Sequence, residues 1–280
     1  MPPTAIQPGL IEPLALHPLK LPGELAGLRL LHITDLHIRK PNKRLQRLLD
    51  ELASDSFAGC DLLLLTGDIM HGEGHESAAL TYLARLIDAV RPRHGAYGCF
   101  GNHDGAAFQQ QARDLPITWL TDSACRLRDL PVNLLGLRCS RTNLNGDLVA
   151  TLLDEAFDPA GESSRFRILL SHLPTWLTPA SQAGIDLLFA GHTHGGQCRL
   201  PGRRTLYNSC NDWPLNLSTG VVQQGRTLAV ISRGLGESNW EGLRFLCKPH
   251  APLVTLEPSD PNPTEPPAVP PRLPTMIVPW

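Results

Sequence analysis

The sequence has almost no net charge, no long apolar run and no closely paired cysteines, and each absence excludes a class of protein. The 280 residues carry a formal charge of -2. Bulk charge is therefore not expected to attract nucleic acid. No apolar run approaches the roughly 18 to 20 residues that cross a membrane. The chain does not begin with a charged segment followed by an apolar one, so no leader peptide is expected.

The number and spacing of the cysteines exclude two further kinds of structure. Seven are scattered along the chain, at positions 60, 99, 125, 139, 198, 210 and 247, and none forms a C-x-x-C motif. An odd, scattered set argues against both a disulfide framework and a zinc knuckle. We expect reduced thiols in a cytoplasmic protein, with peripheral contact to a membrane and the oligomeric state left open. The sequence also lacks G-x-S-x-G, so no serine nucleophile of that type is predicted.

Short apolar runs bounded by turn residues recur along the chain. They span residues 28–35, 61–68, 95–104, 132–138, 166–172, 185–192, 228–234 and 252–257. Continuous apolarity of this length is typical of strands covered on both faces. Leucines with helical spacing lie between the first three runs, over residues 42–55 and 76–90. The order predicts an α/β fold, a layered α/β/β/α sandwich of two mixed sheets flanked by helices.

One domain is expected over residues 28–257. Residues 1–27 are then an N-terminal extension. Residues 258–280 are rich in proline, which fits neither a helix interior nor an inner strand, so this tail is predicted to be disordered.

Five of the apolar runs are followed directly by aspartate, asparagine or histidine. In α/β sheets the carboxyl ends of the strands form the crevice where ligands bind, so these side chains are expected to converge. Singly, each could be a turn former or a buried structural histidine. Turn chemistry does not require histidine, however, so the set as a whole predicts a ligand site. Its members are Asp35, His37, Asp68, Asn102, His172, His192 and His194.

The chemistry of these seven side chains points to metal ions. Two carboxylates, one amide oxygen and four imidazoles suit manganese, iron or zinc, and seven ligands exceed what one tetrahedral ion can use. Two metal ions are therefore predicted, with manganese as the first expectation. Two neighbouring cations repel each other, so a carboxylate should bridge them. Asp68 is the predicted bridge, because it follows a strand expected at the centre of the sheet.

The motifs D-x-H, G-D, G-N-H-D, a lone histidine and G-H-x-H, in this order, resemble the calcineurin-like metallophosphoesterase superfamily. The strings "GHTHGGQ" (191–197) and "SRGLG" (232–236) are similar to its YkuE/YaeI-like branch of bacterial phosphodiesterases. The resemblance implies two ligand sets that share Asp68, namely Asp35, His37, Asp68 and His194 for one ion and Asp68, Asn102, His172 and His192 for the other. It also implies that His103 is a general acid and that Asp104 orients it.

The same resemblance implies a reaction, the hydrolysis of a phosphodiester or pyrophosphate bond by in-line attack of a metal-bridging hydroxide. The substrate would be small or lipid-linked, and some members of the branch act on UDP-2,3-diacylglucosamine. Two alternatives stay open, a phosphomonoesterase or protein phosphatase with the same metals, and a non-catalytic scaffold. Arg39, Arg141 and Arg233 are candidates for binding an anionic substrate group, against the alternatives of solvated surface or an internal ion pair.

Overall fold

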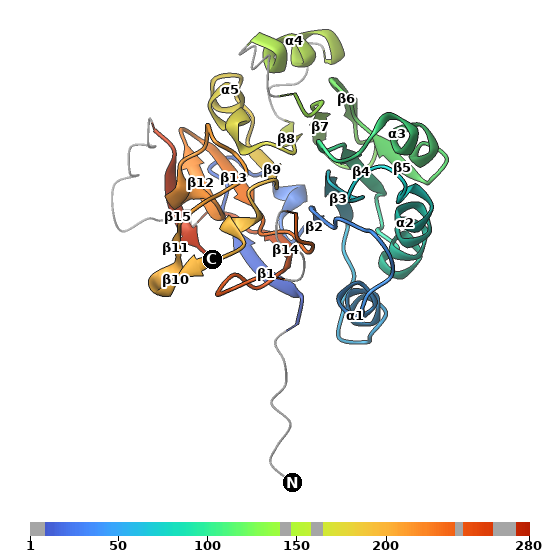
Figure 1. Cartoon of the computed structure of the whole chain (residues 1–280). Helices are drawn as coiled ribbons and strands as arrows, with labels where there is room; N and C mark the ends of the chain where they lie inside the picture. Colours follow the sequence, from blue (N-terminus) through green and yellow to red (C-terminus); the bar gives the residue numbers. More distant parts are fainter. Residues whose placement is uncertain (1–8, 141–146, 158–164, 239–242, 260–272) are drawn as a thin grey trace.

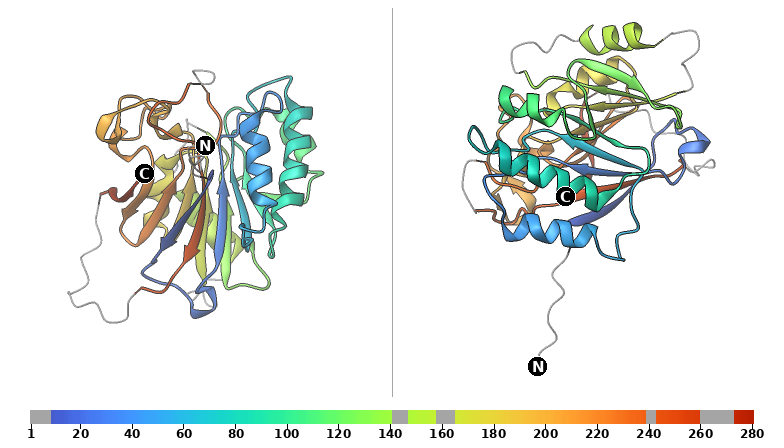
Figure 2. Two further views of the ribbon diagram at one scale, coloured as in Figure 1. Left: turned by 90° about the horizontal axis from the view of Figure 1, so that it is seen from below. Right: turned by 90° about the vertical axis from the view of Figure 1, so that its right-hand side faces the viewer.

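Two mixed β-sheets pack face to face between outer layers of helices (Figures 1 and 2). The computed structural model describes residues 9–140, 147–157, 165–238, 243–259 and 273–280. Among these residues, none of the helices combines the length and apolarity that spanning a bilayer requires.

The first sheet has six strands in the order β1-β14-β2-β3-β4-β5. Their bounds are β1 Ile11–Leu16, β2 Arg29–Ile33, β3 Leu62–Thr66, β4 Ala96–Cys99, β5 Ile117–Trp119 and β14 Ala251–Leu256. Strands β2 to β5 are parallel to one another, and β14 runs antiparallel to β2. Helices α1 (Lys43–Leu52), α2 (Glu76–Val90) and α3 (Ala106–Ala112) cover the outer face.

The second sheet has seven strands in the order β15-β12-β13-β9-β8-β7-β6. Their bounds are β6 Ser123–Arg126, β7 Val132–Gly136, β8 Phe166–Leu170, β9 Leu187–Ala190, β12 Gly220–Gln224, β13 Thr227–Ile231 and β15 Thr275–Pro279. Helices α4 (Asp147–Ala156) and α5 (Leu177–Gln182) cover it. A small hairpin joins β10 (Arg199–Leu200) to β11 (Arg204–Thr205). Short 3-10 helices span Gly23–Leu25, Pro174–Trp176, His194–Gly196, Pro201–Arg203 and Leu215–Leu217.

The apolar core lies in three layers, one between the sheets and one under each set of helices. Strand β3 shows why its sequence is an unbroken leucine run. Leu63 and Leu65 face the helices, whereas Leu62 and Leu64 face the other sheet, because successive side chains point to opposite faces. Three apolar interfaces require four layers, so the predicted α/β/β/α sandwich is confirmed.

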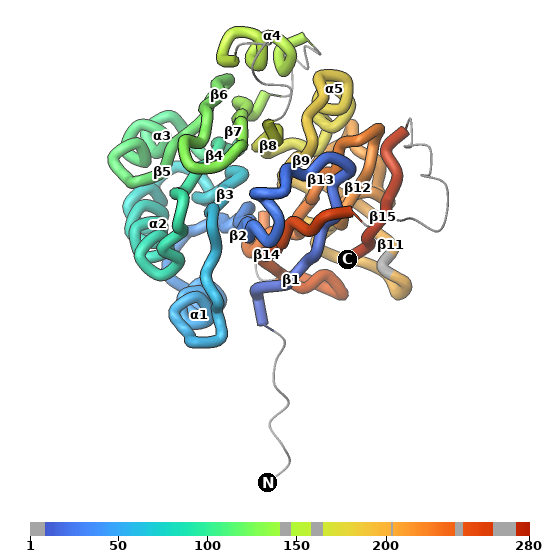
Figure 3. The backbone as a smooth tube through the Cα atoms, turned by 180° about the vertical axis from the view of Figure 1, so that it is seen from behind, coloured from blue at the N-terminus to red at the C-terminus, as the bar shows by residue number. Residues whose placement is uncertain are grey.

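The expected domain limits, residues 28 and 257, are too narrow at both ends. Strand β1 lies within the expected extension 1–27, yet it pairs along its whole length with β14 (Figure 3). Strand β15 lies within the tail 258–280 and pairs antiparallel with β12 at the edge of the second sheet, where a proline is tolerated. The prediction of disorder is therefore wrong for residues 273–280, and residues 260–272 lie outside the described part of the chain.

Candidate metal centre

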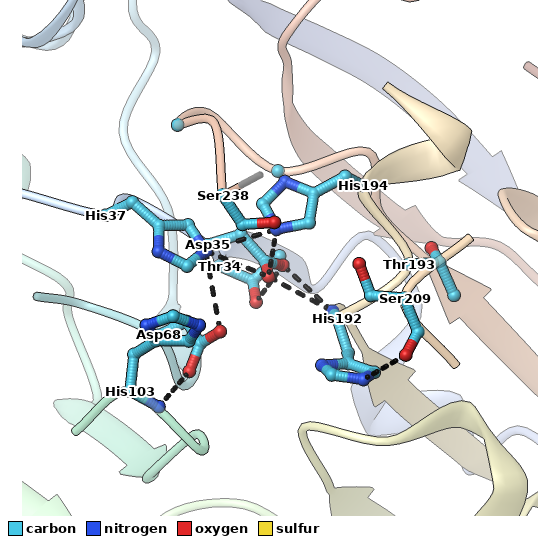
Figure 4. A network of polar contacts seen from close by, with 12 residues as sticks. Thr34, Asp35, His37, Asp68, His103, His192, Thr193, His194, Ser209 and Ser238 are labelled. Atoms are coloured by element: carbon cyan, nitrogen blue, oxygen red, sulfur yellow. Dashed lines mark hydrogen bonds and ion pairs between the residues drawn. The ribbon is translucent and has the colours of Figure 1, made fainter. Parts of the chain in front are cut away.

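The predicted ligands all lie in loops that follow the carboxyl ends of five strands. These strands are β2, β3 and β4 of the first sheet and β8 and β9 of the second. The loops meet where the two sheets pack together, and six of the seven side chains form two compact groups, Asp35, His37 and His194, and Asp68, His172 and His192. Figure 4 shows most of this cluster. The seventh, Asn102, is exposed and lines the same cavity as Asp68 and His192.

The first group is buried and holds its histidines in the neutral form. The Nε2 atoms of His37 and His194 lie 3.1 Å apart, and Asp35 Oδ1 lies 3.3 Å from His194 Nε2. Burial lowers the pKa of His37 to about 3, and it also lowers the pKa of His194. Burial raises the pKa of Asp35 to about 6, which still leaves this carboxyl mostly ionised at pH 7. Neutral imidazoles and a carboxylate are the states that bind a metal ion.

The second group has two histidine rings and a carboxylate arranged so that all three can bind one metal ion. His172 donates its Nδ1 hydrogen to the carbonyl of Thr66 at 2.7 Å, and His192 donates its Nε2 hydrogen to the carbonyl of Ser209 at 3.1 Å. The remaining ring nitrogens, His172 Nε2 and His192 Nδ1, therefore present lone pairs to each other across 3.1 Å. Asp68 Oδ2 lies 3.2 Å from the same His172 nitrogen. A metal ion satisfies all three electron-pair donors at once.

Without a metal ion, these three atoms repel one another unless a proton binds to His172 Nε2 and lies between them. Burial opposes protonation of His172, but the charge of Asp68 outweighs it and holds the pKa of His172 well above its usual value. Metal ions compete with protons for such sites, so the arrangement that attracts a proton here also attracts a metal ion.

Asp68 lies between the two groups. Its Oδ2 is 3.4 Å from His37 Nε2 in the first group and 3.2 Å from His172 Nε2 in the second. Its Oδ1 accepts a hydrogen bond from the backbone N–H of His103 at 2.8 Å. Burial would raise the pKa of Asp68, but His172 and His37 hold it well below the ordinary value. An ionised carboxylate in this position has the geometry that a ligand shared by two ions requires.

Five of the seven side chains sit on backbone that L-residues rarely adopt. The φ angles are 50° for Asp35, 45° for His37, 51° for Asp68, 66° for His192 and 51° for His194. Such conformations cost about 1–3 kcal/mol each and gather at functional sites, where the surrounding structure enforces them. Aspartate and histidine tolerate this region better than most residues. The strained backbone of these loops therefore lowers the stability of the fold, but it directs these side chains toward one another.

Gly191 lets the second sheet approach Asp35. A Cβ at this position would overlap Thr34 Oγ1 and Asp35 Oδ2. The carboxylate of Asp35 is held by hydrogen bonds from Thr34 Oγ1 at 2.8 Å and from the backbone N–H of His192 at 3.0 Å. No side chain can be added at residue 191 without moving one of these partners.

We predict that Gly191→Ala displaces Asp35 and lowers metal affinity and turnover by about 10- to 100-fold, the usual cost of disturbing a group that orients a ligand. Gly23→Ala is the matched control, because nothing lies within 4 Å of a Cβ at that position. Metal titration and steady-state turnover check the result. Equal metal affinity in the two variants would contradict the role given to Gly191.

His103 lies beside the cluster, with a different partner from the predicted one. Its Nδ1 hydrogen is donated to the backbone carbonyl of His71 at 2.7 Å, which leaves Nε2 as the nitrogen available to a substrate. Asp104 was predicted to orient the His103 ring, but it forms no hydrogen bond with that ring. Its carboxylate accepts hydrogen bonds from the backbone N–H groups of Ile69, Met70 and Gly101 instead. Asp104 therefore ties the loop that carries Asp68 to its own loop.

The three predicted arginines have different surroundings. Arg39 lies with its guanidinium 2.5 Å from His71 Nε2, at the edge of the histidine cluster. Arg233 is paired with Glu12, at 2.6 Å, and does not line the cavity beside the metal ligands. The structure thus favours the internal ion pair over the substrate contact for Arg233. Arg141 lies outside the described residues.

The cavity at the cluster is small, about 160 Å³, and part of its lining was not predicted from the sequence. Tyr207, Ser209, Asn211 and Ser238 complete the wall. These four residues are ordinary loop residues without a metal-binding or phosphate-binding pattern. Only their position after the G-H-x-H and S-R-G-L-G strings could have pointed to them.

The sequence matches the calcineurin-like phosphoesterase family over residues 28–196. It is 26% identical to the uncharacterized metallophosphoesterase YkuE of Bacillus subtilis (strain 168), over 90% of this chain and 87% of that protein. It is 25% identical to the phosphodiesterase YaeI of Escherichia coli (strain K12), over 82% and 83%. It is 24% identical to the UDP-2,3-diacylglucosamine pyrophosphatase LpxG of Chlamydia muridarum (strain MoPn / Nigg), over 81% and 83%.

These matches cover most of the chain and agree with the strand-end cluster of aspartate and histidine described above. The chain therefore belongs to the calcineurin-like phosphoesterase family, in the branch that includes YkuE and YaeI, and is a hydrolase.

Proposed function

We propose that this protein hydrolyses a phosphodiester or pyrophosphate bond at two divalent metal ions that share Asp68. Asp35, His37 and His194 would hold one ion with Asp68, and Asn102, His172 and His192 would hold the other. The observation that carries the proposal is the convergence of His172 Nε2, His192 Nδ1 and Asp68 Oδ2, with the two nitrogens 3.1 Å apart. Manganese is the first metal to test, with iron and zinc as alternatives.

Bound there, two cations would polarise the phosphoryl oxygens and lower the pKa of water that attacks phosphorus. The protein side chains supply the rest. The carbonyls of Thr66 and Ser209 fix the rings of His172 and His192, so that these ligands need no reorganisation during the reaction. His103 presents Nε2 to the cavity, where it can give a proton to the leaving oxygen or stabilise its charge.

The cavity volume of about 160 Å³ suits a phosphoryl group, so the rest of a substrate must extend past Tyr207 and Asn211 at its rim. The similarity to LpxG, whose name gives UDP-2,3-diacylglucosamine as its substrate, supports a substrate of that kind, with a pyrophosphate and a lipid part. We also propose a cytoplasmic setting, which the odd number and scattered positions of the seven cysteines support.

We expect manganese-supplemented protein to hydrolyse bis-p-nitrophenyl phosphate faster than p-nitrophenyl phosphate, and UDP-2,3-diacylglucosamine faster than either. The measurement is the steady-state rate for each ester at matched concentrations, with chelator-treated protein as the control. A reversed ratio for the two model esters would favour the phosphomonoesterase alternative. No metal-dependent turnover of any ester would favour a non-catalytic scaffold.

A further inference from the structure

A second concave surface lies away from the metal centre, and nothing described so far uses it. It is a groove of about 1100 Å³ formed by the start of β1, the start of α1, the segment 246–249 and the C-terminal Trp280. Figure 3 shows β1 and the chain end near each other on this side of the molecule. No residue lines both this groove and the cavity at the metal ligands.

The groove is strongly basic. It is lined by the cations Lys43, Arg44, Arg47, Arg199, Arg233 and Lys248, and by one side-chain carboxylate, Glu12. Neighbouring carboxylates neutralise part of this charge, since Arg233 pairs with Glu12, Arg47 with Glu51 and Arg44 with Glu237. Lys43 and Lys248 are exposed, and neither forms an ion pair with a described residue. The chain as a whole carries a charge of only -2, so this local positive charge is a feature of the groove.

Arg233 places a largely buried cation in the lining of the groove. Its side chain lines the groove, only 9% of the residue is exposed, and Nε has no hydrogen-bond partner among the described residues. A buried cationic N–H without a partner is costly, because it has lost water and gained nothing in return. The Nε atom itself is out of reach of solvent, so an anion in the groove would interact with the charge of the guanidinium group and not with this N–H.

The lining also has an apolar part. It consists of Leu10, Ile11, Pro13, Leu246, Pro249 and Trp280. Trp280 is held firmly, because Arg199 donates to its backbone carbonyl at 2.6 Å and its ring packs edge-on against His250. Leu246 is 54% exposed, so its side chain is open to a ligand in the groove. Apolar and basic side chains therefore line the same groove.

We propose that this groove binds an amphiphilic anion, a molecule with one phosphate or carboxylate head and an alkyl chain. The head would lie between Lys43, Lys248 and Arg233, and the chain along Ile11, Leu246 and Trp280. A free inorganic anion would leave the apolar lining in water, and a neutral lipid would leave Lys43 and Lys248 without a counter-charge. The proposal is independent of the reaction at the metal centre.

The test is calorimetric titration of the metal-loaded protein with dodecylphosphonate below its micelle concentration. Inorganic phosphate supplies the head alone, and dodecyl maltoside supplies the chain with a neutral head. We expect dodecylphosphonate to bind at least about tenfold more tightly than either, because it alone contacts both the cations and the apolar lining. Equal affinity for phosphate and dodecylphosphonate would overturn the proposal.

Two variants locate the binding. Lys43→Glu combined with Lys248→Glu should weaken dodecylphosphonate binding at least about tenfold by reversing two charges at the head. Leu246→Asp should weaken it through the chain, and this exposed position allows the change without loss of the fold. Lys20→Glu with Arg128→Glu is the matched control, because it makes the same change in net charge at exposed positions that do not line the groove.

The metal centre could also attract a phosphonate, and Asp68→Asn separates the two sites. Binding that survives Asp68→Asn but is lost in the double lysine variant supports the groove. Binding that is lost in Asp68→Asn and kept in the lysine variant places the ligand at the metal centre and overturns the proposal. Turnover of bis-p-nitrophenyl phosphate should stay unchanged in the lysine variant, since neither residue touches the metal cluster.

Discussion

Asp68→Asn is expected to lose bound metal and activity together, with turnover falling by at least about 10³-fold. The substitution removes a carboxylate whose Oδ2 lies 3.4 Å from His37 Nε2 in one ligand group and 3.2 Å from His172 Nε2 in the other. The amide that replaces it carries no charge. Where its NH₂ group replaces Oδ2, it can also donate to His37 Nε2 or His172 Nε2, and a nitrogen that accepts such a hydrogen bond is not available to a metal ion.

The same variant should fold. Asparagine is as tolerant as aspartate of the left-handed backbone at this residue, where φ is 51°, and its carbonyl oxygen can still accept the hydrogen bond from the N–H of His103. Elemental analysis after gel filtration, steady-state turnover and a thermal melt together check the prediction. Asp61→Asn is the matched control, a buried aspartate at the opposite end of β3 that pairs with Arg93. Retention of both ions by Asp68→Asn, or turnover within tenfold of the wild type, would refute the shared-ligand role.

The fold was predictable where a strand is buried on both faces. The run at residues 61–68 became β3 because its leucines fill the two layers on either side of it, and such a run has few other stable arrangements. Strands β1 and β15 were missed for the opposite reason. Each contains a proline and lies at or near a sheet edge, so its pairing depends on β14 or β12 and leaves little pattern in the sequence.

The candidate site also has a part that the sequence predicts and a part that it does not. Side-chain types at strand ends pointed to seven candidate ligands, because few structural roles require so many histidines in that position, and the structure brings six of them together in two groups. The groups that aim those ligands are mostly backbone carbonyls, those of Thr66, Ser209 and His71, and a carbonyl has no sequence signal because every residue has one. Asp104 was assigned to His103 because the two are adjacent. Neighbours in a tight loop point in different directions, and its carboxylate instead binds the backbone of residues 69, 70 and 101.

His103→Ala is expected to keep both metal ions and to slow the chemical step by about 10²-fold or more. Metal binding should survive because His103 contacts Asp68 only through its backbone N–H, which alanine retains. The loss should depend on the leaving group. Nitrophenolate leaves without protonation, so bis-p-nitrophenyl phosphate should lose little, whereas an alkyl phosphodiester, whose alkoxide must be protonated, should lose the full factor.

This dependence separates an acid from a residue that only binds phosphate, since the loss of a binding contact would slow both esters alike. His75→Ala is the matched control, a histidine in the same ring cluster whose nearest described ring partner is His71, 6.4 Å away between centroids. Its turnover should stay within about threefold of the wild type for both esters. If His103→Ala loses no more activity on the alkyl ester than on the nitrophenyl ester, His103 is not the proton donor. The charge on the leaving oxygen must then be met by the metal centre alone.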